Sequence, residues 1–415
     1  MQAEYRCRGC AAILTQTFVD LGAAPLSNAY LRQDDLDAAE LTYPLHPRVC
    51  SNCFLVQLPQ FNSPDTIFGP DYAYFSSYSE SWLSHARAYV TEACDRLTLT
   101  SDSFVVEIAS NDGYLLQYFL DRAVPVCGIE PAARAAEAAR EKGVTTETFF
   151  FGKTSAGEFI SRHRQADLVV ANNVLAHVPE LHDFVEGLSV LLAPQGVATV
   201  EVPHLLSLLV DVQFDTIYHE HFSYFSLLAL EPVLASHGLR MFDVQRLSTH
   251  GGSLRLWICH AEALFENADA VQSVREEEIA FGLRDISTYA AFAPRVAAVK
   301  RSLLSFLIDA ANAGKDVVGY GAAAKGNTLL NYCGIRSDML PFVVDRNPHK
   351  VGRWLPGSRI PILAADRAIE AKPHYLLILP WNIRDEVVTQ MKEIETSGGR
   401  FVVAIPELTI LTPSA

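Results

Sequence analysis

The sequence predicts an α/β protein with a doubly wound, largely parallel central sheet, a small N-terminal metal module and a second α/β domain at the C-terminus. Strands alternate with helical segments between residues 104 and 203, a strand–glycine turn–helix pattern returns at 316–334, and two C-x-x-C pairs lie in the first 53 residues. Such alternation favours a parallel sheet. A chain of 415 residues is too long for one core, so we expect domains at 1–75, 76–245 and 246–415.

Composition excludes several classes of protein. Apolar residues make up 49% and charged residues 20%, which is typical of a globular protein. A net charge of −15 disfavours a nucleic-acid surface, which needs clustered Lys and Arg. No apolar run is long enough to span a bilayer, and the start MQAEYRCRGC lacks the apolar region of a secretory signal. We therefore expect a cytoplasmic, monomeric enzyme without nucleic-acid or membrane partners.

Four of the eight cysteines form the pairs Cys7/Cys10 and Cys50/Cys53. Two facing pairs supply four soft ligands in tetrahedral geometry, which suits Zn²⁺. Four thiolates leave no position open for water, so we expect a structural metal. Two unrelated redox or core pairs are the less favoured alternative. The other four cysteines stand singly in apolar surroundings, as core residues do.

The central region reads as β-α-β units. Helical periodicity starts at Trp82 and leads into the strand Phe104–Ile108, the turn ASNDG and an amphipathic helix. A second strand ends at Glu130, before an alanine-rich helix. A third strand ends at Asn172 and Asn173, and LAPQGVATVEVP supplies one more strand.

The first strand–helix turn indicates the cofactor. It runs from Glu107 to Gly113 with one glycine, whereas a dinucleotide site requires G-x-G-x-x-G. NAD is therefore disfavoured and a dehydrogenase is a weak alternative. S-adenosylmethionine has no phosphate, and Glu130 is placed to hold its ribose hydroxyls. The alternative for Glu130 is a solvated acid at a helix N-terminus.

The pattern restarts after residue 245. HGGSLRLWICH reads as a strand entered through a glycine turn, and a long helical stretch follows at about 263–313. DVVGYGAAAKGN then opens a Rossmann-like domain, whose turn offers backbone N–H groups and a lysine to a diphosphate. Retention of the turn for packing alone is the alternative. The expected substrate-binding residues are Tyr74, Ser76, Ser77, Gly321, Lys325, Asn327, Asp345 and Lys350.

The order of the motifs carries a resemblance. The two C-x-x-C pairs, E-I-x-x-N-D-G, HEHF, HGG and GYGAAAKGN follow one another along nearly the whole chain. In this order the chain resembles the sugar C-methyltransferases of deoxysugar pathways. The resemblance implies a class I methyltransferase sheet that binds S-adenosylmethionine, a structural Zn²⁺ and a C-terminal domain that holds the nucleotide. The implied substrate is a 4-keto-6-deoxysugar on a nucleoside diphosphate, usually dTDP, which is methylated beside its ketone.

The resemblance also implies roles for individual residues. The general base falls on His221, with Tyr218 and Glu220 in the same segment and His177 as a second active-site histidine. The family's cofactor turn matches Asn111, Asp112 and Gly113. The full set expected at the cofactor is Glu107, Asn111, Asp112, Gly113, Glu130, Phe150, Asn172 and Asn173. Two departures concern the adenine contacts: the common G-x-G is Ala109-Ser110-Asn111, and Phe149 replaces an acid before the paired phenylalanines.

The segment DTIYHEHFSYFS, residues 215–226, mixes titratable groups with aromatics as a pocket lining does. The hydrogen next to a ketone is acidic because its loss gives an enolate, so the reaction needs a base and donors for the enolate oxygen. Imidazole, with a pKa of about 6.5, is suited to be that base. His219 and His221 could instead alternate on a strand with one in the core, and His219 and His250 stay unassigned. An O-methyltransferase and a non-catalytic zinc-containing nucleotide-sugar binding protein are the rival functions.

Overall fold

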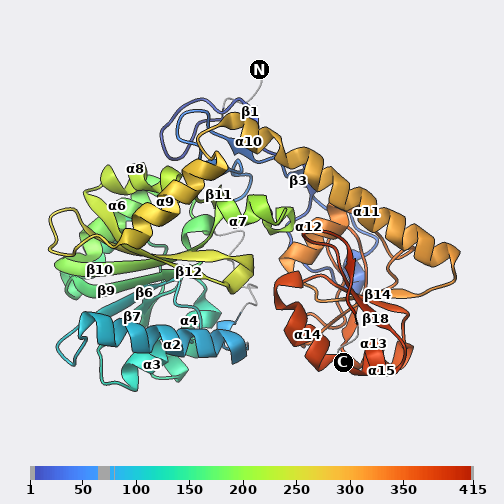
Figure 1. The fold of residues 1–415 in the computed structure, drawn as a ribbon. Coiled ribbons are helices and arrows are strands. Elements are labelled where there is room, and N and C mark those ends of the chain that lie inside the picture. The colour runs from blue at the N-terminus through green and yellow to red at the C-terminus, as the bar shows by residue number, and fades with distance from the viewer. Residues whose placement is uncertain (1–4, 64–74, 79, 413–415) are drawn as a thin grey trace.

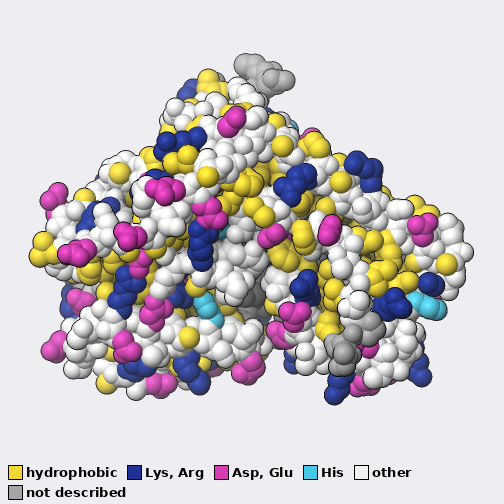
Figure 2. Space-filling view, in the orientation of Figure 1, with side chains coloured by type: hydrophobic (Ala, Val, Ile, Leu, Met, Phe, Trp, Pro, Cys, Tyr) yellow, Lys and Arg dark blue, Asp and Glu magenta, His cyan; other side chains and the backbone are white. Residues whose placement is uncertain are grey.

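The computed structural model describes residues 5–63, 75–78 and 80–412 and shows two α/β lobes joined at one end by the N-terminal residues (Figure 1). A seven-stranded sheet forms the centre of one lobe, and a six-stranded sheet forms the centre of the other. Positive and negative side chains are interspersed on the face of both lobes that Figure 2 shows. Within the described ranges, no helix has the length and apolar character needed to cross a bilayer.

The seven-stranded sheet has the order β12-β13-β10-β9-β6-β7-β8, in which only β13 is antiparallel to its neighbours. Its strands are β6 (Val105–Ile108), β7 (Val126–Ile129), β8 (Thr146–Glu147), β9 (Ala166–Asn172), β10 (Leu192–Pro203), β12 (Leu239–Leu247) and β13 (Ser253–His260). Every residue of β6 and β7 is buried. Parallel strands covered on both faces need such apolar runs, so the predicted doubly wound sheet is confirmed.

Helices cover both faces of this sheet. They are α2 (Glu80–Leu97), α3 (Leu116–Leu120), α4 (Ala133–Glu141), α5 (Lys153–Arg162), α6 (Leu181–Leu191) and α8 (Leu227–Ala235). Helix α7 (Leu205–Val210) packs instead in the core that the N-terminal module shares with the second lobe. Helix α2 buries Ala86, Tyr89, Val90 and Ala93, which lie on the face that the periodicity predicts. This face shares a core with Trp257 of β13.

The last two strands of the first sheet, β12 and β13, meet near the predicted boundary between the second and third domains. The position between residues 245 and 246 falls inside β12, and β13 pairs with both β12 and β10. HGGSLRLWICH therefore forms a strand, as predicted, and this strand completes the first sheet. An antiparallel hairpin at a sheet edge has the same local pattern as a strand that starts a new sheet, so the sequence pattern did not show which sheet it joins.

The second lobe contains the predicted Rossmann-like repeat. Its sheet has the order β16-β15-β14-β17-β18-β19, parallel except for β19. The strands are β14 (Val317–Tyr320), β15 (Val343–Asp345), β16 (Ile362–Ala364), β17 (Tyr375–Ile378), β18 (Arg400–Val403) and β19 (Thr409–Ile410). The helices are α12 (Ala324–Cys333), α13 (Asp366–Ala371), α14 (Arg384–Gln390) and α15 (Glu393–Thr396).

The predicted long helical stretch is divided into three helices, α9 (Asp269–Phe281), α10 (Ile286–Ala290) and α11 (Phe292–Asn312). Gly282 ends α9 in the left-handed region at φ 97°, and the Asp285 carboxylate caps α10. Helices α10 and α11 carry the chain over the top of the molecule into the second lobe (Figure 1).

The N-terminal module shares its sheet and its core with the rest of the protein. Its sheet has the order β1-β4-β5-β11, and β2 (Ala23–Ala24) pairs with β3 (Tyr43–Pro44) beside it. Strands β1 (Gln16–Thr17), β4 (Arg48–Val49) and β5 (Val56–Gln57) are local, but β11 (Ser223–Tyr224) comes from the segment after HEHF. Phe18 stacks on Phe292 of α11 at 4.7 Å. The module therefore packs between the lobes and touches the segment that carries His221.

Candidate active site

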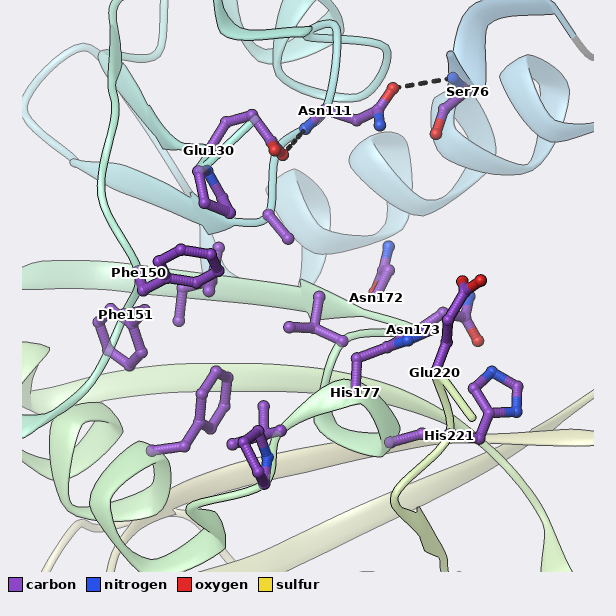
Figure 3. Close-up of a pocket in the computed structure, with 18 of the residues that line it drawn as sticks. Ser76, Asn111, Glu130, Phe150, Phe151, Asn172, Asn173, His177, Glu220 and His221 are labelled. Atoms are coloured by element: carbon purple, nitrogen blue, oxygen red, sulfur yellow. Dashed lines mark hydrogen bonds between the residues drawn. The ribbon is translucent and has the colours of Figure 1, made fainter. Parts of the chain in front are cut away.

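A cavity of about 820 Å³ lies at the carboxyl ends of the parallel strands of the first lobe and extends to the second lobe. The N-terminal module contributes Asn28, the segment before α2 contributes Ser76, and the second lobe contributes Lys325 and Lys350. Phe150 and Phe151 lie at one end, and Glu220 and His221 lie at the other (Figure 3). The predicted site residues that line it are Ser76, Asn111, Glu130, Phe150, Asn172, Asn173, His177, Tyr218, Glu220, His221, Lys325 and Lys350.

The turn after β6 is tight because several residues have a left-handed backbone. Ala109 has φ 53°, Asn111 has φ 50° and Gly113 has φ 73°. The Asn111 N–H donates to Glu130 Oε2 at 2.9 Å, and its side-chain Oδ1 accepts from the Ser76 N–H at 2.9 Å. The turn is thus joined to the end of β7 and to the segment before α2, as the dashed lines in Figure 3 show.

Glu130 follows β7 and is buried in the cavity wall. Its Oε1 accepts the N–H of Ala132 at 2.7 Å, just before α4, and its Oε2 accepts that of Asn111. Burial raises the pKa of Glu130. The acid does lie at a helix N-terminus, but it is not solvated. A carboxylate oxygen can accept two hydrogen bonds. Each oxygen of Glu130 accepts one in the structure, so a lone pair on each remains for a ligand hydroxyl.

Other parts of the cavity wall carry aromatic rings and amides. Phe149, Phe150 and Phe151 line the cavity, and Phe151 packs edge-on against Phe184 at 5.2 Å. Asn172 and Asn173 face the cavity from the end of β9. Their amide atoms are buried and have no hydrogen-bond partner within the described part of the chain. Buried amides without partners are costly, so these groups are suited to a polar ligand.

Three of the predicted cofactor residues are not among the described residues that line the cavity. Glu107 is buried in the sheet, where burial raises its pKa well above the ordinary value. Asp112 forms an ion pair with Lys142 at 2.9 Å. Gly113 allows close packing, because a Cβ there would lie 3.0 Å from Val144 Cγ2. These residues shape the turn from behind, and the sequence motif does not distinguish that role from ligand contact.

His221 is fixed in one tautomer by its main-chain neighbour. Its Nδ1 lies 2.9 Å from the carbonyl oxygen of Thr216, which can only accept, so Nδ1 carries hydrogen. The ring lies 4.0 Å from Tyr218 and 4.7 Å from His177, centroid to centroid. Burial, with the charges of His177 and other basic groups including Lys325, lowers the pKa of His221 well below its usual value. The imidazole is therefore neutral, with its lone pair on Nε2.

Two acid–base groups beside His221 are also shifted by burial. Glu220 accepts a hydrogen bond of 2.6 Å from Asn28 Nδ2, and burial raises its pKa to about 7. Burial lowers the pKa of His177 to about 4. A hydrogen bond between the His177 ring and the main chain of Glu220 opposes this shift. At neutral pH His177 is thus uncharged, while Glu220 is partly protonated.

The structure separates the two unassigned histidines. The His219 ring lies against the N-terminal module, with Nε2 at 3.2 Å from the carbonyl of Tyr43, and it is not among the residues lining the cavity. His250 lines the cavity, with a left-handed φ of 55° and its ring 5.5 Å from that of Trp82. Of the two histidines of the H-E-H motif, only His221 therefore reaches the site.

Two lysines of the second lobe reach the cavity. Lys325 Nζ donates to Asn382 Oδ1 at 3.1 Å and to the carbonyl of His250 at 3.3 Å, and burial lowers its pKa. Lys350 Nζ donates to the carbonyl of Ala322 at 2.9 Å. The start of α12 contributes Ala323 and Ala324 to the wall, so backbone N–H groups and two ammonium groups converge there.

The other predicted substrate residues hold loops in place. Gly321 has φ 95°, and a Cβ there would lie 2.5 Å from Pro380 Cδ. Asp345 accepts the N–H groups of Ala322 and Asn347, and Ser77 accepts a hydrogen bond from Lys142. None of them, nor Asn327, is among the described residues that line the cavity. Tyr74 lies outside the described residues.

The sequence prediction missed several lining residues, of which Asn28, Trp82 and Asn382 come from three different parts of the fold. Asn28 and Asn382 are single polar residues in loops, and no spacing rule marks them. Trp82 begins the predicted helix, and its ring stacks on His85 at 4.9 Å. The glycines after His250 predict an unusual backbone conformation, but nothing in the sequence predicts that His250 lines the cavity.

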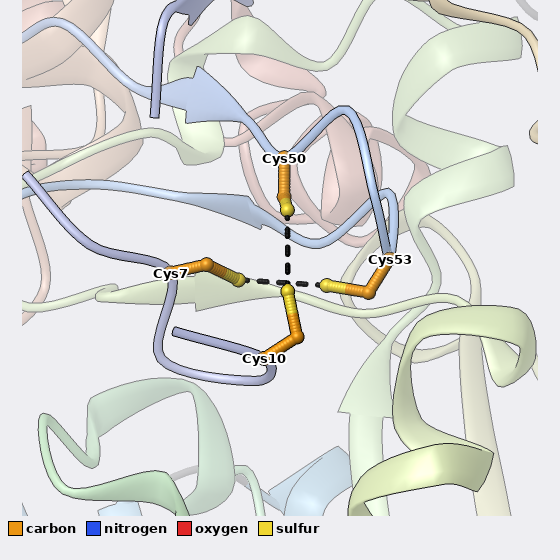
Figure 4. Close-up of side chains that lie close together, drawn as sticks. All are labelled: Cys7, Cys10, Cys50 and Cys53. Atoms are coloured by element: carbon orange, nitrogen blue, oxygen red, sulfur yellow. Dashed lines mark hydrogen bonds between the residues drawn. The ribbon is translucent and has the colours of Figure 1, made fainter. Parts of the chain in front are cut away.

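The four predicted metal ligands converge (Figure 4). Their sulfur atoms lie within 4.8 Å of one another, with 3.4 Å between Cys7 and Cys53 and 3.5 Å between Cys10 and Cys50. Tetrahedral Zn²⁺ with bonds of about 2.3 Å needs sulfur separations of about 3.8 Å. Gln57 Nε2 donates to Cys7 Sγ at 3.1 Å, which suits a thiolate. The donor set therefore fits a closed zinc centre.

Comparison with known families assigns each part of the chain. Residues 7–68 match a family described as "Putative zinc binding domain", 82–244 match "Methyltransferase domain", and 248–406 match "C-methyltransferase C-terminal domain". Together with the cofactor turn and the four cysteines, these matches define an S-adenosylmethionine-dependent C-methyltransferase with a zinc module.

The chain belongs to the same family as C-methyltransferase NovU of Streptomyces niveus, to which it is 38% identical over 406 residues, covering 98% of this chain and 96% of that protein. Solved methyltransferase structures are similar to part of the chain. Magnesium protoporphyrin IX methyltransferase (ChlM) from Synechocystis PCC 6803 is 14% identical, with a TM-score of 0.33 over 47% of this chain and 88% of that chain. CcbJ from Streptomyces caelestis is 16% identical, with a TM-score of 0.32 over 42% and 88%.

Proposed function

We propose that the protein methylates the carbon next to the ketone of a 4-keto-6-deoxysugar carried on a nucleoside diphosphate, with dTDP as the expected carrier. The observation that carries this proposal is the tautomer of His221. Because Nδ1–H donates to Thr216, the basic lone pair lies on Nε2 of a ring that lines the same cavity as the cofactor turn. A base in that place is suited to take an α-proton beside an activated methyl group.

In the proposed reaction, His221 Nε2 takes the α-proton, and the electrons of the broken C–H bond pass to the ketone as an enolate. Tyr218 or His177, whose rings lie closest to His221, steadies the enolate oxygen. Glu130, Asn172 and Asn173 would hold S-adenosylmethionine, which would supply the activated methyl group for the carbanion, with S-adenosylhomocysteine as the leaving group. Glu220 tunes this end of the cavity through its shifted protonation.

The diphosphate is expected at the second lobe. Lys325 and Lys350 line the cavity there beside the start of α12, and ammonium groups with helix N–H groups suit phosphate oxygens. Glu130, the phenylalanines and the two amides are then left for the cofactor.

Proton exchange tests this proposal. The protein, loaded with S-adenosylhomocysteine in D₂O, is incubated with dTDP-4-keto-6-deoxyglucose, and deuterium at the carbons next to the ketone is followed by NMR. We expect exchange with the wild type, its loss in His221→Asn, and a product with a new carbon-bound methyl when S-adenosylmethionine is supplied. A methyl group found on oxygen would contradict the proposal.

A further inference from the structure

The segment that carries His221 has little regular structure of its own. A short 3-10 turn (Phe214–Thr216) precedes it and the two-residue strand β11 follows it. A side chain on such a segment is placed only as precisely as its main chain is held. The groups that hold this main chain therefore decide where Nε2 of His221 lies.

The peptide groups beside His221 are held by two different parts of the fold. The N–H of Phe222 donates to the Ala176 carbonyl of the first lobe at 2.7 Å. Its carbonyl oxygen accepts the Leu58 N–H at 2.9 Å and Arg8 Nη1 at 2.8 Å, both from the N-terminal module. Phe222 is thus clamped between the lobe that holds His177 and the module that holds the cysteines.

Arg8 connects this clamp to the thiolate centre. It lies between Cys7 and Cys10, and its Nη2 also donates to the Leu58 carbonyl at 2.7 Å. Its guanidinium lies 5.3 Å from the centre of the Phe222 ring. Its N–H donates to Gln57 Oε1 at 2.9 Å, and Gln57 Nε2 donates to Cys7 Sγ. A continuous chain of hydrogen bonds therefore runs from a cysteine sulfur to the peptide that follows His221.

We propose that Arg8 is a positioning residue for His221, and that the four-cysteine knuckle serves the reaction by fixing Arg8 against Phe222. This inference rests on the proposed role of His221 as the base. The planar guanidinium binds two carbonyl oxygens at once, on Leu58 and Phe222, which a single ammonium group cannot do in the same geometry. Without the guanidinium, the Phe222 carbonyl keeps only the Leu58 N–H as a hydrogen-bond donor from the module. His221 is then no longer held at a fixed distance from the substrate.

The first experiment reads the ring directly and needs no sugar. Zinc-loaded protein labelled with ¹⁵N-histidine and saturated with S-adenosylmethionine is compared with Arg8→Ala, and the His221 signals are assigned by their loss in His221→Asn. We expect one Nδ1–H tautomer in the wild type and averaged tautomers in Arg8→Ala at unchanged zinc content. Unchanged His221 signals in the zinc-loaded variant would overturn the inference. Should Arg8→Ala lose zinc, Arg8→Lys gives the same comparison. This variant keeps the positive charge but lacks the planar guanidinium that donates to two carbonyl oxygens.

The second experiment measures the consequence for the reaction. We expect Arg8→Ala to lower kcat and sugar deuterium exchange together by between about tenfold and about 100-fold, as expected for a base displaced by about 1 Å, with KM for both substrates within about threefold. Millimolar guanidinium should restore part of the rate. Arg6→Ala is the matched control, because Arg6 is exposed on the same knuckle and donates to the Ala11 carbonyl.

The two failures are distinguishable. Wild-type protein that neither exchanges nor methylates the sugar would reject the proposed function, while the ¹⁵N spectrum still decides whether Arg8 fixes the ring. Wild-type exchange with equal exchange in Arg8→Ala would reject the positioning role alone.

Discussion

Asn28 and Glu220 lie 192 positions apart in the chain and are joined by a hydrogen bond of 2.6 Å between Nδ2 and Oε1. It is the contact through which the N-terminal module reaches a cavity-lining acid. Burial raises the pKa of Glu220 to about 7, and this hydrogen bond opposes the rise because it favours the carboxylate. We expect Asn28→Ala to raise the pKa of Glu220 further, measured by ¹³C NMR titration with assignment through Glu220→Gln. An unchanged or lower pKa would contradict this assignment, and Asn62→Ala in the same module is the control.

Replacement of the proposed base should remove most of the activity. We expect His221→Asn to lower kcat by between about 10² and 10⁴, the range for loss of a general base, with S-adenosylmethionine affinity unchanged by calorimetry. His219→Gln is the matched control, since its ring lies outside the cavity and glutamine keeps a donor for the Tyr43 carbonyl. Near-normal turnover in His221→Asn would reject the assignment of His221 as the general base.

The lowered pKa of His221 predicts an unusual pH profile. The base works in its neutral form, and that form persists below the ordinary histidine pKa of about 6.5 when the pKa is depressed. In Glu220→Gln, which removes the acid with a pKa of about 7, we therefore expect kcat/KM for the sugar to stay level as the pH falls through 6.5 and to decline only well below it. The measurement is a pH series for kcat/KM. Loss of half of kcat/KM at a pH equal to or above the ordinary histidine pKa would show that burial does not lower the pKa of His221.

Buried histidines should also make stability depend on pH. Burial lowers the pKa of His177 and of His250 to about 4 in the folded protein, while the unfolded value is about 6.5. Between these values the unfolded chain binds more protons, so the free energy of unfolding falls as the pH is lowered from about 6.5 to about 4. We expect His250→Gln to reduce this slope by up to about 1.4 kcal/mol per pH unit, measured by urea titrations. If the free energy of unfolding had the same pH dependence in His250→Gln as in the wild type, the lowered pKa of His250 would be contradicted.

The lysine at the start of α12 should bind the nucleotide. We expect Lys325→Ala to weaken dTDP binding by between about tenfold and about 150-fold, since a hydrogen bond to a charged group contributes about 1.5–3 kcal/mol. Calorimetry with dTDP gives the dissociation constant, and exposed Lys392 of the same lobe supplies the control Lys392→Ala. Unchanged binding in Lys325→Ala would mean that the glycine turn serves packing alone.

Features with short-range patterns could be predicted from the sequence. The strands that end at Glu130 and Asn172 form the expected sheet because their apolar runs and turns are local signals. The two C-x-x-C pairs converge because each pair is a local knuckle. The choice of His221 over His219 as the proposed base came from a family resemblance. Of these two histidines, only His221 lines the cavity.

Features that depend on packing between distant segments could not be predicted. Asn28 reaches the cavity only because the N-terminal module packs against the segment after residue 214. Strand β13 joins the first sheet through pairing with β10, which its own residues do not encode. The motif residues Asp112 and Gly113 lie behind the turn, because a tight turn needs residues that shape it as well as residues that bind.

The late position of β11 has a consequence for biosynthesis. Strand β5 pairs with β4 on one side and with Ser223 and Tyr224 on the other. A nascent chain that has emerged only to residue 75 therefore exposes a bare strand edge, and such edges promote association between chains. The first 75 residues should not form a stable unit when expressed alone, even with metal supplied, because the ribosome has yet to make the strand that closes their sheet.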